Sequence, residues 1–225
     1  TSCIFCPDEK QSLFREENGY RAVRCDGCGL VFVNPRPTIE EMKQLYEGQE
    51  TKIDLSAHLK KRDLKCTQAE ESLRWVGRYC PQGRLLEVGS AAGYFLWEAK
   101  KAGYDVLGVD LTRQFVAFSN RVLKVPAFEG TLRSAPLEKG SFDVIYMRNV
   151  LSHLAHPLEE FSLLASLLRP GGHLILETGN VAELDPTIPC DLELPDHLFH
   201  FSEKTIRLLF EKTGFVVRED RKSVV

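Results

Sequence analysis

Four of the seven cysteines in this 225-residue chain stand near its start in two pairs, Cys3-x-x-Cys6 and Cys25-x-x-Cys28. Two such pairs separated by 18 residues have the spacing of a tetrahedral zinc site with four thiolate ligands, in which each pair comes from a tight turn. The alternative is two disulfides in a secreted protein. The other cysteines are scattered and no signal-peptide pattern precedes the first pair, so we expect structural zinc in a reducing, cytoplasmic compartment.

A second group of reactive side chains lies in the segment LELPDHLFHFSEKT, residues 192–205. Asp196 and His197 could form a catalytic pair, His197 and His200 could share a metal, or all of them could be packing residues. No third metal ligand is obvious, and His200 stands between two phenylalanines. We therefore expect Asp196 and His197 to act on substrate and His200 to be structural.

A turn of small residues follows the apolar run that starts at Leu85 in LLEVGSAAGYFL. Gly89, Ala91 and Gly93 would let the backbone approach a ligand closely. A dinucleotide-binding fingerprint would require a further glycine where Tyr94 stands, so the turn does not match that class.

Two carboxylates stand at the ends of predicted strands near this turn. Glu87 closes an otherwise apolar run, where it would be costly to bury beside a pyrophosphate but suits a cationic or hydroxyl-bearing ligand. Asp110 follows Gly89 by 21 residues, at the end of the next strand, and could accept hydrogen bonds from the two ribose hydroxyls of an adenosyl group. Nicotinamide enzymes share that acid, so it does not by itself name the cofactor.

From residue 84 onward, short apolar runs alternate with segments of helical period. This alternation predicts a parallel sheet covered by helices on both faces, the doubly wound, Rossmann-like α/β class, whose ligands lie beyond the carboxyl ends of the strands. The predicted strands are 84–89, 105–110, 126–130, 142–150, 172–178 and 215–220, and the predicted helices are 94–102, 114–123, 157–168 and 203–213.

The chain before the sheet divides into two further parts. Residues 1–37 predict a zinc ribbon that depends on its metal for stability, because so small a unit cannot bury enough apolar surface. Residues 38–79 predict a helical connector or lid, with Thr38 as a helix N-cap and an amphipathic helix over 57–79. Residues 80–225 form the predicted sheet domain.

Four segments follow one another at a characteristic spacing, LLEVGSAAGYFL, VLGVDLT, GTLRSAPLEKGSFDVIYMRNVLSHLAHP and LLRPGGHLILET. Together they resemble the class I S-adenosylmethionine-dependent methyltransferases over residues 84–225. The resemblance implies a cofactor site with Glu87, Gly89, Ala91 and Gly93 around the methionine part, Asp110 and Leu111 at the ribose and adenine, and Thr131, Leu132 and Met147 along the adenine and sulfonium pocket. Many members have glycine in place of Ala91 and an acid in place of Thr131, so the turn should be tighter here and the adenine contact could come from backbone.

The amino-terminal CxxC…CDGCGLVFVNPRP, joined to this domain, resembles a bacterial subgroup of sugar, polysaccharide and natural-product methyltransferases, including the nucleotide-linked deoxysugar C-methyltransferases. In the C-methylating members an acid-His pair precedes the last large helix and a histidine follows the fourth strand, positions matched here by Asp196, His197 and His153. A tyrosine that precedes the pair in those enzymes has no counterpart here, so O- and C-methylation both stay open.

Methyl transfer from a sulfonium is an in-line displacement, in which the protein aligns the acceptor and, where needed, removes its proton. Histidine is the usual base at neutral pH. We therefore expect His197 or His153 to supply a general base, with Asp196 orienting it or touching substrate. Arg148 and Asn149, at the end of the fourth strand, could hold substrate hydroxyls or carbonyls.

The charge balance bears on the partner. The chain has 29 Lys and Arg against 32 Asp and Glu, a net charge of −3, and none of its three parts is basic. We therefore expect a small-molecule substrate, for which a nucleotide sugar is one candidate, and no nucleic-acid partner. No apolar run reaches the roughly 18 residues that span a bilayer, so we expect no membrane role. An RNA base methyltransferase with a zinc-ribbon recognition module and a non-catalytic interaction protein are the alternatives.

Overall fold

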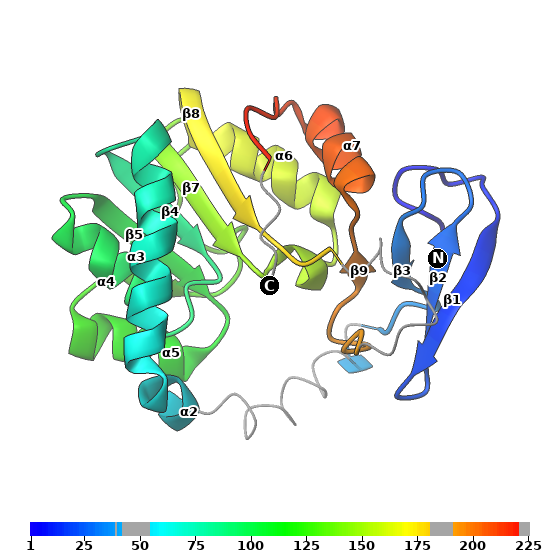
Figure 1. Ribbon diagram of the computed structural model, residues 1–225, viewed down its shortest axis with the longest axis horizontal. Coiled ribbons are helices and arrows are strands. Elements are labelled where there is room, and N and C mark those ends of the chain that lie inside the picture. The colour runs from blue at the N-terminus through cyan, green and yellow to red at the C-terminus, as the bar shows by residue number, and fades with distance from the viewer. Residues whose placement is uncertain (39, 42–54, 181–190, 221–225) are drawn as a thin grey trace. The chain divides into compact units, whose positions relative to one another are not determined.

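The computed structural model describes residues 1–38, 40–41, 55–180 and 191–220, and the chain divides into two compact units (Figure 1). Each unit combines segments that are distant in the sequence. The sheet unit comprises Gln44–Val150 and Ser166–Glu177, and the cysteine unit comprises Thr1–Lys43, Leu151–Ala165 and Thr178–Val225. The division of the sequence into a ribbon, a connector and a sheet domain stays a prediction.

The sheet unit is built on five parallel strands. They are β4 (Arg84–Val88), β5 (Asp105–Asp110), β6 (Ala127–Glu129), β7 (Phe142–Arg148) and β8 (Leu168–Glu177). Their order in the sheet is β6-β5-β4-β7-β8, and every neighbouring pair is parallel. Strand order reverses between β4 and β7, which defines a doubly wound sheet and its switch point. The predicted Rossmann-like α/β class is therefore confirmed.

The central strands are buried on both faces, which explains their continuous apolar runs. Residues 144–147 of β7 are at most 1% exposed. The ring of Tyr146 stacks on that of Phe95, with 4.0 Å between the ring centroids. Phe95 belongs to α4 (Tyr94–Lys101), which packs with α3 (Arg62–Tyr79) against the sheet, and Figure 1 shows α3 running alongside the strands.

The helices of the sheet unit follow the sequence prediction with small shifts. The helix predicted over 57–79 is divided into α2 (Leu55–Lys60) and α3. The helix predicted over 114–123 forms as α5 (Arg113–Phe118) followed by a π-helical turn, Ser119–Leu123. No helix in the described parts of the chain is long and apolar enough to cross a membrane.

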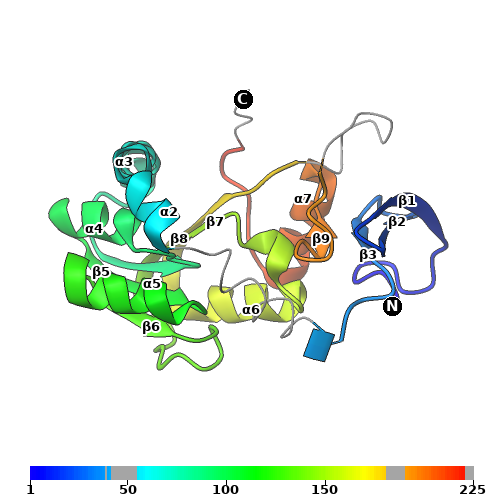
Figure 2. The same cartoon turned by 90° about the horizontal axis from the view of Figure 1, so that it is seen from below.

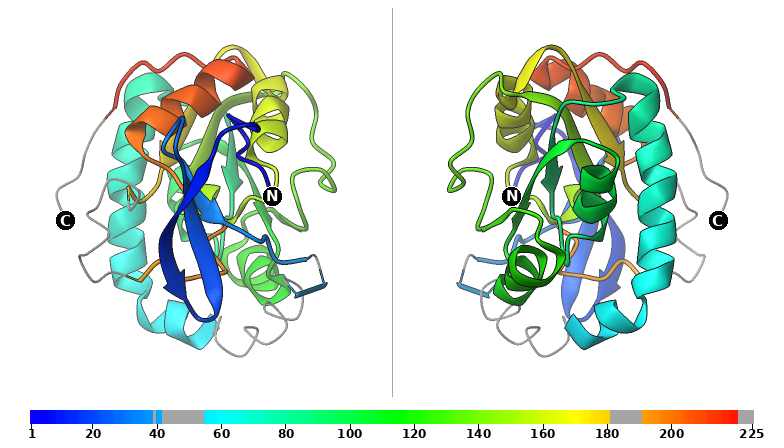
Figure 3. Two further views of the ribbon diagram at one scale, coloured as in Figure 1. Left: turned by 90° about the vertical axis from the view of Figure 1, so that its right-hand side faces the viewer. Right: turned by 90° about the vertical axis from the view of Figure 1, so that its left-hand side faces the viewer.

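The cysteine unit contains a four-stranded antiparallel sheet in the order β1-β2-β3-β9. Its strands are β1 (Gln11–Glu17), β2 (Tyr20–Cys25), β3 (Val31–Val33) and β9 (Phe199–His200). Strands β1 and β2 form a twisted hairpin (Figure 3).

Two local features connect the strands of this small sheet. Asn18 and Gly19 form the turn of the hairpin with φ values of 54° and 81°, the left-handed conformation that two-residue hairpin turns require. At the other edge, β9 lies beside β3 (Figure 2), with Val31 opposite His200. Residues from near both ends of the chain therefore share one sheet, which the sequence prediction did not include.

The strand predicted over 215–220 is wrong, because these residues form no strand. Helix α7 (Glu203–Thr213) ends in a left-handed glycine, and the N–H of Phe215 then bonds to the carbonyl of Phe210. The ring of Phe215 packs on those of Phe161 and Phe210, at centroid distances of 6.2 and 5.9 Å. The apolar side chain that suggested a strand closes the end of a helix instead.

Helix starts in the cysteine unit have residues that favour or cap the first turn. Helix α6 (Pro157–Leu167) begins with proline, and Ser202 and Thr205 exchange hydrogen bonds in a capping box at the start of α7. Thr38 and Glu41 make a similar reciprocal contact, with Thr38 N–H donating to the carboxylate at 2.7 Å. The helix predicted after Thr38 lies largely outside the described residues.

Candidate functional site

The four predicted zinc ligands come together in the cysteine unit. The Sγ atoms of Cys3, Cys6, Cys25 and Cys28 all lie within 4.8 Å of one another, and those of Cys3 and Cys28 are 3.6 Å apart. A tight turn shapes the second pair, since the N–H of Gly29 bonds back to the carbonyl of Cys25. The six cysteines among the described residues are free thiols, so none of them forms the alternative disulfides.

Burial and hydrogen bonding shift the pKa values of Cys3, Cys25 and Cys28 in opposite directions. Burial raises the pKa of Cys3 and of Cys28. Burial also acts to raise the pKa of Cys25, but hydrogen bonds from the N–H groups of Cys28 and Gly27 outweigh it, and the pKa is lowered. A divalent cation among the sulfurs would stabilise the thiolate form of all four, because a coordinated thiol is deprotonated. Geometry and donor chemistry therefore fit a structural zinc ion.

Glu87 is buried near the end of β4 and is 6% exposed. Its Oε2 atom has no hydrogen-bond partner among the described residues. Burial raises the pKa of Glu87 well above its ordinary value, and the charge of Asp110 raises it further. An unsatisfied buried oxygen is the place where a donor group of a ligand would fit, such as an ammonium group or a hydroxyl.

The turn after β4 has left-handed backbone at three predicted cofactor positions. The φ angle is 71° at Gly89, 44° at Ala91 and 80° at Gly93. A side chain on Gly89 would collide with Val150, and one on Gly93 with Ser119, so both positions require glycine. Ala91 holds a positive φ despite its methyl group, a conformation uncommon for residues other than glycine.

Asp110, at the end of β5, connects this turn to the next loop. Its Oδ2 accepts the N–H of Ala91 at 2.7 Å, and its Oδ1 accepts the N–H of Thr112 at 2.8 Å. Each carboxylate oxygen has a second lone pair, so the two bonds leave room for two hydroxyl donors. The next residue, Leu111, is 64% exposed, which leaves an apolar side chain for contact with a planar ring.

The remaining predicted pocket residues have different surroundings. Thr131 is exposed, and its N–H donates to the hydroxyl of Ser134 at 2.9 Å. Leu132 is 5% exposed. Met147 is fully buried in β7, opposite Val88 of β4, and contributes to the core of the sheet. Contact of these residues with a cofactor stays a prediction.

An acid that the sequence prediction missed organises the ends of β7 and β8. Glu177 accepts hydrogen bonds from the hydroxyls of Tyr146 and Ser72, each at 2.8 Å, and its Oε2 lies 3.4 Å from Nε of Arg148. Its backbone carbonyl accepts the N–H of Asn149 at 2.8 Å, and the side chain of Asn149 is exposed. An acid at the end of an apolar run, as in LILE, is the signal that could have found it.

The two histidine stretches meet within the cysteine unit. Nδ1 of His153 lies 3.5 Å from Oδ1 of Asp196 and 3.1 Å from the backbone carbonyl oxygen of the same residue. The rings of His153 and His197 are 4.5 Å apart in an edge-to-face arrangement. Nε2 of His197 lies 3.2 Å from Oε2 of Glu193. Asp196 therefore pairs with His153 and Glu193 with His197, whereas the sequence suggested that Asp196 pairs with His197.

The three clustered histidines have different surroundings. Burial acts to lower the pKa of His153, but the hydrogen bond and charge of Asp196 outweigh it and raise the pKa. Burial lowers the pKa of His197, and the charge of His153 lowers it further. His200 is 5% exposed in β9, and burial lowers its pKa to about 4. His200 thus has the surroundings of the structural residue that the sequence suggests.

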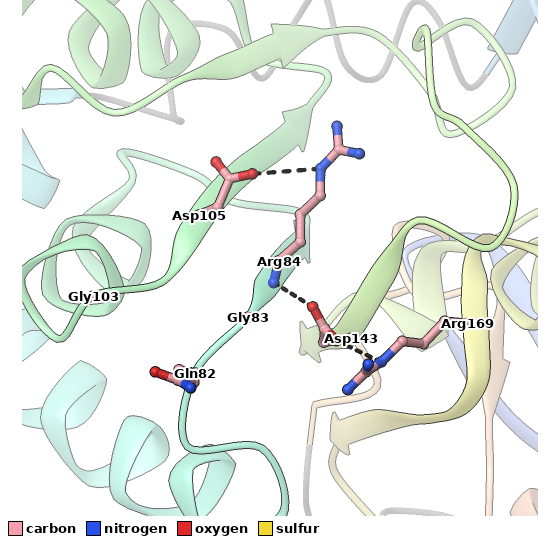
Figure 4. Close-up of a pocket in the computed structure, with 7 residues that line it drawn as sticks. All are labelled: Gln82, Gly83, Arg84, Gly103, Asp105, Asp143 and Arg169. Carbon is pink, nitrogen blue, oxygen red and sulfur yellow. Dashed lines mark hydrogen bonds and ion pairs between the residues drawn. The ribbon is translucent and has the colours of Figure 1, made fainter.

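In the sheet unit, a pocket of about 550 Å³ lies at the amino-terminal ends of the parallel strands (Figure 4). Nε of Arg84 is 3.6 Å from the carboxylate of Asp105, and Nε of Arg169 is 2.5 Å from that of Asp143, so its charges are paired with one another. Ligands of doubly wound sheets bind beyond the carboxyl ends of the strands, so we do not assign the cofactor here. The pocket is lined by Gln82, Gly83, Arg84, Gly103, Asp105, Asp143 and Arg169.

The sheet order, the glycine turn and the two acids near the ends of β4 and β5 define a class I S-adenosylmethionine-dependent methyltransferase domain. A family model described as "Methyltransferase domain" matches residues 56–220, and the chain belongs to this family. The predicted enzyme class and its cofactor are therefore confirmed at the level of the domain.

Curated relatives carry the name tRNA U34 carboxymethyltransferase. The protein of that name from Azotobacter vinelandii is 35% identical over 146 residues, which cover 59% of this chain and 45% of that protein. The one from Syntrophotalea carbinolica is 39% identical over 126 residues, which cover 50% of this chain and 38% of that protein. This chain thus spans less than half the length of these relatives.

Solved structures agree with the fold. A Thermotoga maritima protein described as an S-adenosylmethionine-dependent methyltransferase, possible histamine N-methyltransferase, has a TM-score of 0.56 and 20% identity, covering 75% of this chain and 80% of that one. A methyltransferase from Mesorhizobium loti has a TM-score of 0.55 and 22% identity, covering 67% of this chain and 83% of that one. At this level of identity they support the architecture alone.

These relatives overturn the expected partner. The prediction that the protein has no nucleic-acid partner is wrong, because the relatives are named for tRNA and not for a sugar or natural product. The prediction counted charges over whole segments of the chain. Such counts average away any local group of cations that the fold assembles.

Asp110→Asn should weaken binding of S-adenosylmethionine by roughly 10- to 100-fold, because hydrogen bonds to a charged acceptor contribute about 1.5–3 kcal/mol. Isothermal titration calorimetry on the whole chain measures the affinity. Asp105→Asn is the matched control, since it removes a largely exposed charge from the other end of the same strand. Equal affinities in the two variants would contradict the role of Asp110.

Gly89→Ala should lower the free energy of unfolding more than Gly103→Ala. Both glycines have positive φ, 71° and 94°, but an added Cβ meets another side chain at Gly89 and nothing within 4 Å at Gly103. The left-handed backbone alone costs about 1–2 kcal/mol for an alanine, so the control should lose that amount and Gly89→Ala should lose more. Urea unfolding monitored by circular dichroism measures both, and equal losses would show that Val150 moves aside without cost.

Proposed function

We propose that this protein transfers a methyl group from S-adenosylmethionine to RNA. The observation that carries the proposal is the similarity of its methyltransferase domain to enzymes named for U34 of tRNA. Because the chain spans less than half of those relatives, the proposal concerns the class of substrate and leaves the modified position open.

A group of cations in the sheet unit supports an anionic substrate. Burial lowers the pKa of Lys65, and the charges of Arg148 and Lys61 lower it further. Burial also lowers the pKa of His58, on which Lys65 and Lys61 act in the same direction. Lys61 and Arg148 are therefore each close enough to Lys65 to repel its charge. A phosphate group bound among them would relieve that repulsion, as in the phosphate contacts that dominate nucleic-acid affinity.

This cationic group lies near the predicted cofactor residues. His58 of α2 packs its ring against Phe115, with 4.5 Å between centroids, and the charge of Asp110 acts on its pKa in the raising direction. Asp110 in turn accepts the N–H of Ala91 in the turn after β4. An RNA phosphate held by the lysines would therefore bind on the same side of the sheet unit as the cofactor.

S-adenosylmethionine, when bound, supplies a methyl group on a positively charged sulfonium. In the arrangement that we propose, Glu87 receives the ammonium group of the methionine part and Asp110 receives the ribose hydroxyls. Arg148, which Glu177 holds at 3.4 Å, would contact a phosphate or a base carbonyl of the acceptor. Each of these residues acts by binding and orientation, the part of methyl transfer that a protein supplies.

The cluster of His153, Asp196 and His197 keeps its predicted catalytic role within this proposal. The two histidines have pKa values shifted in opposite directions, His153 upward and His197 downward, so His197 is the ring that loses its proton more readily. A neutral imidazole is the form that can accept a proton or ligate a metal.

Lys65→Ala should weaken RNA binding and reduce the slope of log affinity against log salt by about 1, because one phosphate contact is lost. Lys139→Ala, an exposed lysine elsewhere in the sheet unit, is the control and should leave the slope unchanged. Filter binding of bulk tRNA at several salt concentrations measures both slopes, and labelled S-adenosylmethionine measures transfer to the same RNA. No label in RNA, or equal slopes in the two variants, would count against the proposal.

We also propose that Cys3, Cys6, Cys25 and Cys28 hold structural zinc. The four converging sulfurs and the buried thiols that a cation would stabilise support it. When bound, the ion would tie the amino-terminal turn to the turn between β2 and β3, and its binding free energy would add to folding.

Cys25→Ser should lose most of the bound zinc, since a tetrahedral site with three thiolates binds the ion less tightly. The unfolding midpoint should fall by roughly 2–4 °C for each kcal/mol of binding free energy lost. Cys66→Ser, a half-buried cysteine of the sheet unit, is the control and should keep its zinc. Elemental analysis gives the metal content and calorimetry the midpoint, and a zinc-free protein with an unchanged midpoint would refute a structural role.

A further inference from the structure

The cysteine unit contains a second group of ligating side chains that is separate from the four cysteines. One ring nitrogen of His153, one ring nitrogen of His197 and one carboxylate oxygen of Asp196 all lie within 4.8 Å of one another. Two imidazoles and one carboxylate form the donor set of metal sites that have three protein ligands and open positions, as in catalytic zinc and non-haem iron sites. We propose that these three side chains bind one divalent transition-metal ion such as Zn²⁺.

The spacing of the three ligands suits an ion of this size. A tetrahedral ion with bonds of about 2.1 Å holds its ligand atoms about 3.4 Å apart. The three ligand atoms here lie within 4.8 Å of one another, so small side-chain rotations can bring them to the distances that an ion requires. The side chains of His153, Asp196 and His197 are 30%, 28% and 25% exposed. They are shielded enough to hold an ion in place, and open enough for it to enter from solution.

The outer contacts of both histidines are those of metal ligands. Nδ1 of His153 faces the carbonyl oxygen of Asp196 at 3.1 Å, and Nε2 of His197 faces the carboxylate of Glu193 at 3.2 Å. A ligating histidine almost always donates its second N–H to a carbonyl or a carboxylate, which fixes the ring and its tautomer. Each ring here thus has one nitrogen beside a carbonyl or carboxylate oxygen that could fix its orientation.

Backbone hydrogen bonds fix the two segments that carry the ligands. The N–H of Leu198 donates to the carbonyl of Ser152 at 2.8 Å, which joins the segment of His197 to that of His153. The carboxylate of Glu17 accepts the N–H groups of Leu192 and Leu194, at 2.8 and 3.0 Å, and so holds the turn before Asp196 on strand β1. The ligands are therefore preorganised before any ion binds.

The two metal sites of this unit would differ in chemistry. Four thiolates select a soft ion in a closed site, whereas two imidazoles and a carboxylate leave coordination positions for water or a substrate oxygen. An ion there would change the histidines from proton acceptors into ligands, and its bound water would become the acidic group of the cluster. The site itself does not depend on RNA being the substrate.

Calorimetric titration of Zn²⁺ into the whole chain, with its cysteine site already filled, tests the proposal. We expect one further binding event in the unsubstituted protein. His153→Ala and Asp196→Asn should abolish it, and Glu193→Gln should weaken it by roughly 10- to 100-fold, the usual effect of losing an outer partner. His156→Ala is the matched control, because this exposed histidine lies three residues from a proposed ligand and should leave the event intact.

Retention of the cysteine-bound zinc shows whether each variant keeps the unit folded. Titration with Co²⁺ adds a spectroscopic readout, since cobalt at the histidine site should show no thiolate charge-transfer band. The absence of a second event at millimolar zinc, an unchanged event in both His153→Ala and Asp196→Asn, or a thiolate band on cobalt addition would each overturn the proposal. Neither S-adenosylmethionine nor RNA is present, so failure of the RNA proposal would leave these results unaffected.

Discussion

The carboxyl group of Glu87 is buried near the end of β4, with one oxygen that no described residue satisfies. Leaving a buried polar group without a partner costs about 1–3 kcal/mol, and more when the group is charged. The surrounding turn is built for a ligand that removes this cost. Glycines at 89 and 93 bring the backbone close, and Asp110 ties the turn to β5 while keeping lone pairs for hydroxyl donors. The cofactor site that we propose is thus a group of polar side chains at the end of otherwise apolar strands.

The small antiparallel sheet has a role beyond its own four cysteines. Strand β9 pairs with β3, and the carboxylate of Glu17 in β1 holds the turn before Asp196. The ribbon therefore supports the segment that carries Asp196 and His197. Cys25 ends strand β2, which is hydrogen-bonded to β3, and β3 is hydrogen-bonded to β9. Zinc bound to the cysteines would therefore also stabilise the segment of the histidine cluster, which β9 continues.

The prediction that nucleic acid is not a partner failed for a physical reason. Net charge measures the long-range field of a protein, whereas a phosphate contact needs only two or three cations close together. The charges of Lys61 and Arg148 both act on Lys65, in a chain with a net charge of −3. Lys61 and Lys65 are neighbours in sequence, but Arg148 comes from the end of a strand far along the chain. The fold alone brings these charges together.

The sequence by itself determined the features that depend on short-range pattern. Alternating apolar runs and helical segments specify the doubly wound sheet, the glycine turn after β4 specifies close ligand approach, and two CxxC pairs specify a four-thiolate cluster. Only the tertiary structure decided which acid pairs with which histidine, that Phe215 closes the end of a helix, and that Glu177 orients Arg148. Apart from the pair of Glu193 and His197, which lie four positions apart, these depend on contacts between residues tens of positions apart. Local spacing holds no information about such contacts, because side-chain partners are chosen by packing and by the need to satisfy buried polar groups.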